Sequence, residues 1–128
     1  MEEFDLALKD YTTVIEISTD DWQNMRAFNG RANIFRKTQE WESCIEEYTK
    51  ALEFSESSVV YSNRAYVYEK LEDYEKAEAD YTKIIELDTL DFESYTTRGY
   101  FYEELEKYDK AEADYIIAHE LAPEDPMP

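Results

Sequence analysis

The sequence has 128 residues, a length that suits one domain. Hydrophobic residues make up 43% of it and aromatic residues 16%, which excludes a disordered acidic chain, because such chains contain few aromatics. Its 13 basic and 32 acidic residues give a net charge of −19. This charge argues against nucleic acid and against anionic membrane surfaces as partners, since phosphate contacts need Lys and Arg.

Targeting and redox signals are weak in this sequence. The start of the chain lacks the basic, apolar and small-residue order of a signal peptide, and no apolar run approaches the length of a membrane span. The only cysteine, Cys44, cannot form an intrachain disulfide. We expect a cytoplasmic location, although a chain whose targeting segment had been removed would have the same features.

Apolar residues at spacings of three and four predict helices along the whole chain, and no stretch alternates as a strand would. Polar breaks separate the helices, with Asp20 or Asp21 and Ser57 or Ser58 as expected caps. The prolines after residue 122 end the last helix. The seven expected helices span residues 4–17, 22–38, 41–54, 59–71, 74–87, 92–105 and 108–121.

An eight-residue phrase occurs twice, from Tyr74 to Tyr81 and from Tyr108 to Tyr115, with a single difference between the copies. Weaker copies begin at Trp41 and at Phe4. A period of about 34 residues predicts a stacked repeat array, in which each repeat buries its apolar face on its neighbours. We expect a single domain over residues 1–128, with a half repeat at 4–19 and full repeats at about 25–57, 58–91 and 92–125.

Two columns of small residues recur in these repeats, and they predict close approach of helix backbones. On the first helix of each pair they are Ala32, Ala65 and Gly99, and on the second they are Ala7, Cys44, Ala77 and Ala111. We therefore interpret Cys44 as a buried packing residue. Rings stand beside the small residues, at Phe35, Tyr68 and Tyr102 on the first helices and at Tyr11, Tyr48, Tyr81 and Tyr115 on the second.

The last full unit contains Tyr95-x2-Arg98-Gly99-x2-Tyr102, then Ala111-x3-Tyr115, then Pro123. This pattern resembles the tetratricopeptide repeat, whose phrase is W-x2-L-G-x2-Y, then A-x3-F, then P. The resemblance covers residues 4–125. It implies an all-α fold, a right-handed superhelical array of antiparallel helix pairs (an α-solenoid). It also implies a concave groove, lined by the first helices, that holds a peptide or a partner helix.

One departure from the family phrase is systematic. Where the family has leucine, this chain has Arg31, Arg64 and Arg98. Each second helix carries an acid just before its ring, at Asp10, Glu47, Asp80 and Asp114. Because an arginine in an apolar layer needs a carboxylate partner, we predict arginine–carboxylate pairs between helices. The alternative is three solvated arginines.

The resemblance places ten residues in the partner-binding groove: Arg26, Asn29, Asn33, Arg36, Lys37, Asn63, Tyr66, Lys70, Tyr100 and Glu103. In chain order this set is basic, then polar and aromatic, then acidic. Gly30 is expected to leave backbone uncovered where a ligand could approach. The alternative is a small array without a specific groove, whose charges are only solvated.

Some family members hold the acidic C-terminal tails of heat-shock chaperones with a carboxylate clamp of lysines, asparagines and an arginine. Asn33 and Asn63 match the two asparagines of the clamp, but Asn29 replaces its first lysine. Glu93 and Thr97 replace its last lysine and arginine. We therefore expect no useful binding of acidic chaperone tails. A segment with an acidic end near Arg26, Arg36 and Lys37 and a basic end near Glu103 is expected to bind instead.

These patterns favour a non-enzymatic scaffold that binds a protein or peptide partner. The alternative is self-assembly, with homodimers through array ends that leave Phe4, Leu8 and Ile15, or Tyr115, Ile116 and Ile117, partly uncovered. Docking of the tail after Pro123 would cap the last helix in another way. We expect no catalytic, cofactor or metal site, because His119 and Cys44 are single and distant in sequence and both glycines lie within helices.

Overall fold

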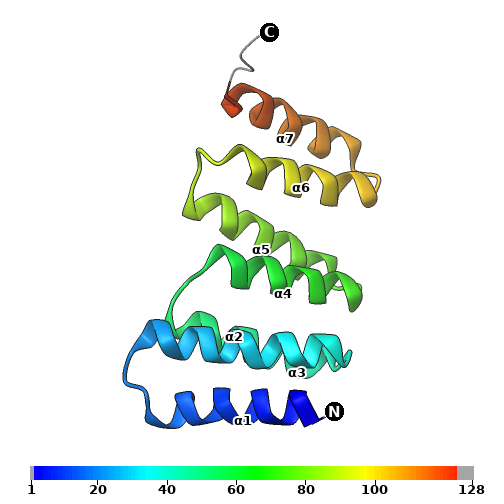
Figure 1. The fold of residues 1–128 in the computed structure, drawn as a ribbon. Helices are drawn as coiled ribbons and strands as arrows, with labels where there is room; N and C mark the ends of the chain where they lie inside the picture. The colour runs from blue at the N-terminus through cyan, green and yellow to red at the C-terminus, as the bar shows by residue number, and fades with distance from the viewer. Residues whose placement is uncertain (1, 124–128) are drawn as a thin grey trace, which may run out of the picture. The chain divides into compact units, whose positions relative to one another are not determined.

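The computed structural model describes residues 2–123, which form seven α-helices and no strand (Figure 1). The helices are α1 (Glu2–Ile17), α2 (Asp21–Lys37), α3 (Trp41–Phe54), α4 (Ser58–Lys70), α5 (Tyr74–Leu87), α6 (Phe92–Glu104) and α7 (Tyr108–Leu121). Their number and order confirm the helices expected from the sequence, with bounds that differ by two residues at most. The expected docking of the tail after Pro123 concerns residues outside the described range.

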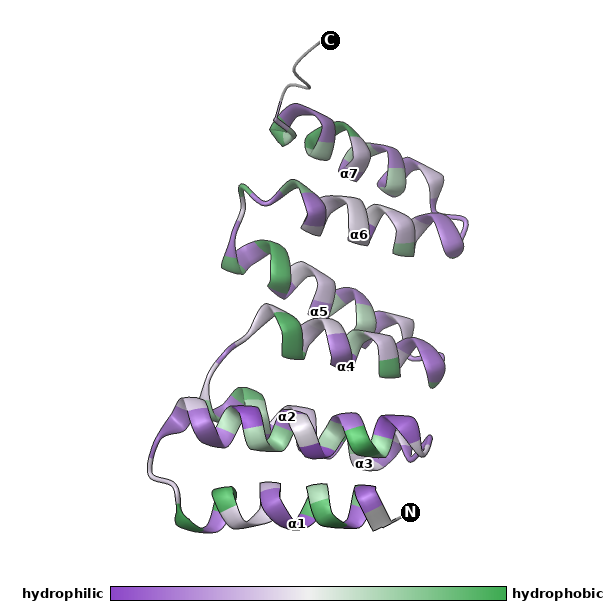
Figure 2. Cartoon of the chain, viewed as in Figure 1, coloured by the Kyte–Doolittle hydropathy of each residue, from purple (hydrophilic) through white to green (hydrophobic). Residues whose placement is uncertain are grey.

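The chain packs as two compact units, residues 1–80 and 81–128, with the division inside α5. In the first unit α2 pairs with α3, α1 packs on α2, and α4 packs on α3. In the second unit α6 pairs with α7. Hydrophobic and hydrophilic segments alternate along the helices, as amphipathic packing requires (Figure 2).

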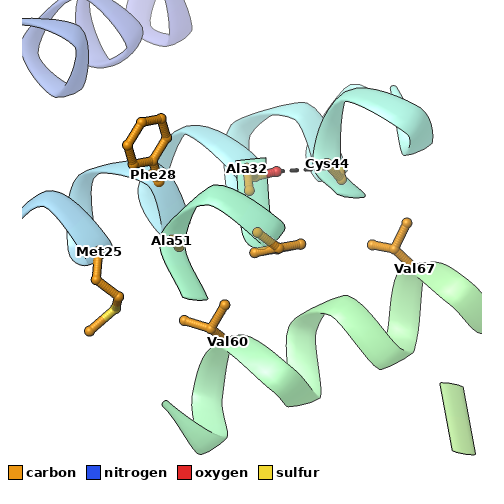
Figure 3. Packing of buried hydrophobic residues seen from close by; sticks show 8 residues of the cluster. Met25, Phe28, Ala32, Cys44, Ala51, Val60 and Val67 are labelled. Atoms are coloured by element: carbon orange, nitrogen blue, oxygen red, sulfur yellow. Dashed lines mark hydrogen bonds between the residues drawn. The ribbon is translucent and has the colours of Figure 1, made fainter. Parts of the chain in front are cut away.

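The core of the first unit lies among α2, α3 and α4 (Figure 3). Cys44 is fully buried in it and donates a hydrogen bond from its thiol to the backbone oxygen of Ala32, at 3.4 Å. The position and burial of Cys44 confirm its interpretation as a packing residue. The cluster of buried residues consists of Met25, Phe28, Ala32, Cys44, Tyr48, Ala51, Val60 and Val67.

Both glycines make room for a tyrosine ring from another helix. A Cβ atom on Gly30 would lie 2.3 Å from Cζ of Tyr11, and one on Gly99 would lie 2.7 Å from Cε1 of Tyr115. A separation of this size is a clash, so the missing side chains permit the two rings to pack. The ring of Tyr11 therefore fills the space that a side chain of Gly30 would occupy, while the expected approach of a ligand to the backbone of Gly30, which lines a cleft, stays a prediction.

A tight turn joins the two helices of each of the three pairs. Each turn contains one non-glycine residue with positive φ: Gln39 (61°), Glu72 (58°) or Glu106 (61°). The residue that follows closes the turn by donating its amide to a ring residue of the first helix. Asp73 N bonds to Tyr68 O at 2.8 Å, and Lys107 N to Tyr102 O at 2.9 Å. This left-handed ending stops α2, α4 and α6 one residue before the expected end.

Candidate functional site

The three predicted arginine–carboxylate pairs are present. Arg64 donates to both carboxylate oxygens of Asp80, from Nε at 2.9 Å and from Nη2 at 2.7 Å. Arg98 binds Asp114 in the same two-bonded way, with both distances 2.8 Å. Arg31 makes a single bond, from Nη2 to Oε1 of Glu47 at 2.8 Å. The alternative of solvated arginines is wrong, since each carboxylate is buried.

Burial disfavours the charged form of Arg64, but the hydrogen bond and the charge of Asp80 outweigh burial and raise the pKa of the guanidinium. The guanidinium of Arg64 therefore stays charged at neutral pH. The longer side chain of Glu47 pairs less completely, because its Oε2 is buried without a hydrogen-bond partner among the described residues. These pairs fix the register of each helix against its partner.

A column of threonines completes each pair, and the sequence reasoning missed it. The third guanidinium nitrogen, Nη1, donates to a threonine hydroxyl on the preceding second helix. Arg31 reaches Thr12 at 3.2 Å, Arg64 reaches Thr49 at 3.1 Å and Arg98 reaches Thr82 at 3.1 Å. The sequence did contain a signal for these contacts: a threonine directly follows the last tyrosine of the eight-residue phrase in three of its four copies. Each arginine thereby joins its own pair of helices to the helix before it.

The first unit brings together six of the predicted groove residues on α2 and α4. We call this set the donor patch, and it consists of Asn29, Asn33, Arg36, Asn63, Tyr66 and Lys70. Asn63 Nδ2 donates to Asn29 Oδ1 at 3.2 Å, although the two residues lie 34 positions apart in sequence. The hydroxyl of Tyr48 donates to Asn33 Oδ1. With their carbonyl oxygens engaged, Asn29 and Asn33 are left with amide donors to offer to a ligand.

Two cations of the donor patch lie over one ring. The guanidinium of Arg36, from α2, lies 5.4 Å from the ring centroid of Tyr66, and the amine of Lys70, from α4, lies 5.3 Å from it. Such contacts hold a cation in place without neutralising it. Tyr66 is 42% exposed, so part of its ring stays open to a partner.

A cleft of about 450 Å³ lies between α1 and α2 beside the donor patch. Arg26 lies over the ring of Trp22 at 4.7 Å, and both residues line this cleft. Trp22 was not predicted as a site residue. The only feature of the sequence that pointed to it was its place near the predicted groove residue Arg26. Lys37 lies 5.9 Å from the ring of Phe4 on α1. The other residues that line the cleft are Tyr11, Val14, Gln23, Ala27, Asn29, Gly30 and Asn33.

The remaining two predicted residues lie on α6, in the second unit, which is described by itself. Tyr100 is 62% exposed. Glu103 accepts a hydrogen bond from the hydroxyl of Tyr115 at 2.8 Å. Burial and this hydrogen bond raise the pKa of Tyr115 to about 12. Glu93 and Glu104 are also exposed on α6, so this helix presents an acidic face.

Within the described residues we searched for metal-binding clusters and for membrane-spanning helices. No three His, Cys, Asp or Glu side chains in this part of the chain gather closely enough to hold a metal ion. Among the same residues, no helix has both the length and the apolar character needed to cross a membrane.

Comparison with known proteins identifies the family. Two family profiles described as tetratricopeptide repeat match residues 58–88 and residues 80–113. The chain is also 30% identical to the second TPR of Spaghetti (RPAP3), solved bound to the HSP90 peptide SRMEEVD, with a TM-score of 0.64. The match covers 77% of this chain and 92% of that one. The chain belongs to the tetratricopeptide repeat (TPR) family. Its fold is accordingly an all-α solenoid of helix pairs, as the sequence predicted.

Two longer TPR structures share the fold at lower identity. A tetratricopeptide repeat protein from Parabacteroides merdae is 22% identical, with a TM-score of 0.81, and the match covers 98% of this chain and 49% of that one. MamA is 18% identical, with a TM-score of 0.74, and the match covers 89% of this chain and 66% of that one. The chain thus spans less than two thirds of either protein. Among proteins with curated descriptions, none matches the sequence.

Proposed function

We propose that this TPR chain is a non-enzymatic scaffold that binds an extended peptide segment of a partner protein at the donor patch. The observation that carries this proposal is the convergence of Asn29, Asn33 and Arg36 with residues of α4 on one surface. A TPR relative at 30% identity was solved with a bound peptide, which supports a peptide as the class of ligand.

The chemistry of the donor patch favours a ligand rich in hydrogen-bond acceptors. It offers amide donors from asparagines and positive charge from Arg36 and Lys70, while the whole chain carries a net charge of −19. A local basic area on an acidic protein selects for negative charge in the ligand by electrostatic complementarity. Carboxylate side chains and peptide carbonyl groups both satisfy the donors. The exposed part of the Tyr66 ring would hold an apolar or aromatic residue of the ligand.

The acidic face of α6 supports a separate prediction about the charge of a ligand. Glu93 and Glu103 would repel a peptide that is acidic throughout, because juxtaposed like charges cost several kcal/mol when desolvated. Asn29 also supplies no charge at the position where the family clamp has lysine. We therefore propose that the donor patch favours an acidic segment of a ligand, and that the surface near Tyr100 and Glu103 separately favours a basic one.

A peptide array with charge-swapped pairs of equal composition tests this proposal. Acidic-to-basic peptides should bind more tightly than their reversed partners and than acidic tails of the SRMEEVD kind. Binding should weaken with salt, since exposed charges are screened beyond about 10 Å at 0.1 M. Arg36→Glu and Tyr66→Ala should each reduce it.

Lys107→Glu is the matched control for Arg36→Glu, because it makes the same change of charge in an exposed turn of the second unit. It should leave the ranking of the peptides unchanged. Tighter binding of acidic tails, or binding that is unchanged in both Arg36→Glu and Tyr66→Ala, would overturn the proposal.

We also propose self-association as a second candidate, on the basis of the outer face of α7. Tyr108 is 61% exposed and Ile116 is 51% exposed, and both line a mostly apolar cleft of about 500 Å³. Contiguous apolar surface of this kind marks interaction sites. Light scattering at rising concentration should show a dimer that Ile116→Lys abolishes. Ala113→Lys, on an exposed position of the same helix, should not affect it. A strict monomer would remove this candidate.

A further inference from the structure

An exposed stripe runs along α1, on the side of the helix opposite Tyr11. It consists of Leu6, Asp10, Thr13 and Ile17, whose spacings of four, three and four place them on one helical face. Leu6 is 64% exposed and Ile17 is 74% exposed. Phe4, Leu8 and Ile15, which the sequence predicted to be partly uncovered, are half-buried.

The same positions of the other second helices are covered by a first helix. Asp10 aligns with Glu47 and Asp80, which bind Arg31 and Arg64. Ile17 aligns with Phe54, whose ring stacks on Phe28 with centroids 5.6 Å apart and planes at 17°. The stripe on α1 therefore repeats the half of a helix pair that elsewhere receives an arginine-bearing helix.

The position of Leu6 shows what kind of residue would pack there. It aligns with Lys76 and Lys110, which lie over ring residues of their first helices: the amine of Lys76 is 5.8 Å from the Tyr68 ring, and that of Lys110 is 5.5 Å from the Tyr102 ring. On α1 the lysine is replaced by leucine, so the contact with an incoming ring would be wholly apolar.

The charge of the stripe is also distinctive. Thr13 aligns with Lys50, Lys83 and Ile117, and Leu6 aligns with Ser43 besides the two lysines, so α1 has no cation at either place where two of its three counterparts carry one. Among the described residues no basic group pairs with Asp10, which is exposed, whereas Glu47, Asp80 and Asp114 are each buried against an arginine. A single carboxylate between apolar side chains, without a competing cation, is complementary to a helix that carries one arginine between apolar residues.

We propose that this stripe docks an amphipathic helix of a partner protein, with an arginine flanked by an apolar or aromatic residue three positions before it and another four positions after it. In the antiparallel arrangement of the other pairs, the arginine would bind Asp10. The first flanking residue would pack on Ile17, as Phe28 does on Phe54, and the second would pack on Leu6. This surface faces away from Tyr11 and the cleft that Tyr11 lines, so the inference does not depend on peptide binding at the donor patch.

The chain itself supplies a probe with this pattern. Residues 58–71 contain Tyr61, Arg64 and Tyr68 at the required spacings, and in α4 this segment already places Arg64 on Asp80. The experiment measures fluorescence anisotropy of a fluorescein-labelled, amidated peptide of this sequence as the full 128-residue chain is added. A second peptide carries Arg64→Gln. The protein variants are Asp10→Asn, Asp10→Glu and Ile17→Lys.

The wild-type peptide should bind the wild-type chain. Asp10→Asn and the Arg64→Gln peptide should each weaken binding by about tenfold, which corresponds to about 1.4 kcal/mol. Combining the two changes should weaken binding no further, since both remove the same ion pair. Asp10→Glu should restore most of the affinity, and Ile17→Lys should reduce it.

Ile116→Lys on α7 serves as the control for binding at the other exposed apolar helix. Three results would overturn the inference. The first is no binding. The second is binding that Ile116→Lys abolishes and Asp10→Asn leaves unchanged, which would place the peptide on α7. The third is a wild-type chain that self-associates through Leu6 and does not bind the peptide, which would make the stripe a contact between copies.

Discussion

Arg64 and Asp80 lie 16 residues apart and form two parallel hydrogen bonds, at 2.9 and 2.7 Å. Asp80 is only 3% exposed, so neither water nor a surface cation can replace its partner. A two-bonded arginine–carboxylate pair of this kind fixes geometry as well as charge. The pair therefore links α4 to α5 at one register, and its equivalents link α2 to α3 and α6 to α7.

Asp80→Asn should strongly destabilise the chain. The substitution keeps the shape of the side chain but leaves Arg64 with an uncompensated, partly buried charge, a loss worth roughly 3–5 kcal/mol when a buried pair is broken. Asp10→Asn makes the same chemical change at the exposed, unpaired position of the same column and should alter stability by no more than about 0.5 kcal/mol. Urea unfolding followed by circular dichroism measures both. Equal effects of the two variants would show that the buried pair adds nothing.

Glu72→Gly should stabilise the chain. Glu72 has a φ of 58°, a left-handed conformation that costs a residue with a side chain roughly 1–2 kcal/mol and costs glycine almost nothing. We expect part of this strain to be recovered as a higher melting temperature. Glu75→Gly, three residues later in the first turn of α5, should instead lower it, because glycine is unfavourable within a helix. A loss of stability in both variants would contradict the strained-turn interpretation.

Ala77→Leu should overpack a close contact between helices. Ala77 is fully buried in the small-residue column of α5. Added methylene groups in a well-packed site cost roughly 1–3 kcal/mol. Ala79→Leu, at an exposed position of the same helix, provides the control and should leave the unfolding midpoint nearly unchanged. An unchanged midpoint for Ala77→Leu would mean that this column does not mediate close packing.

The contribution of Cys44 to the free energy of unfolding should change at alkaline pH. Burial raises the pKa of its thiol from 9.0 to about 11, against a smaller lowering by Arg36. The folded state therefore holds this proton more tightly than the unfolded state does. The resulting stability is fully present below about pH 9 and is lost as the pH rises toward about 11.

Cys44→Ala should remove this part of the pH dependence and leave the contribution of the tyrosines, because burial raises the pKa of Tyr48 to about 12. The measurement is the difference in unfolding free energy between wild type and variant from pH 8 to pH 11. A constant difference across this window would refute the assignment to Cys44.

Much of the fold follows from patterns that sequence alone displays. The spacing of apolar residues determines the helices, and a constant offset of 16 residues between Arg64 and Asp80 also relates Arg31 to Glu47, which made the pairs predictable. The threonine contacts were not predictable, because they depend on where the third guanidinium nitrogen points after the other two are bound.

Other features required coordinates for different reasons. Glu72 adopts a left-handed backbone conformation although it is not a glycine, so its residue type did not indicate that conformation. The position of the Tyr11 ring beside Gly30 depends on how α1 packs against α2. Six of the ten predicted site residues lie together on α2 and α4, because equivalent faces of successive first helices share one side of a repeat, and their role in binding a partner stays a prediction. The prediction missed Trp22, over whose ring Arg26 lies.

The most direct test of the interaction-scaffold account is a titration of ¹⁵N-labelled protein with the tightest acidic-to-basic peptide of the charge-swapped set, followed by heteronuclear NMR. The account predicts that the side-chain amide signals of Asn29, Asn33 and Asn63 and the backbone signals of Arg36 and Tyr66 shift together and saturate with one dissociation constant. It also predicts that signals from the α1 stripe stay fixed. Shifts confined to α7 or to the α1 stripe, with the three asparagine amides unmoved at saturation, would contradict it.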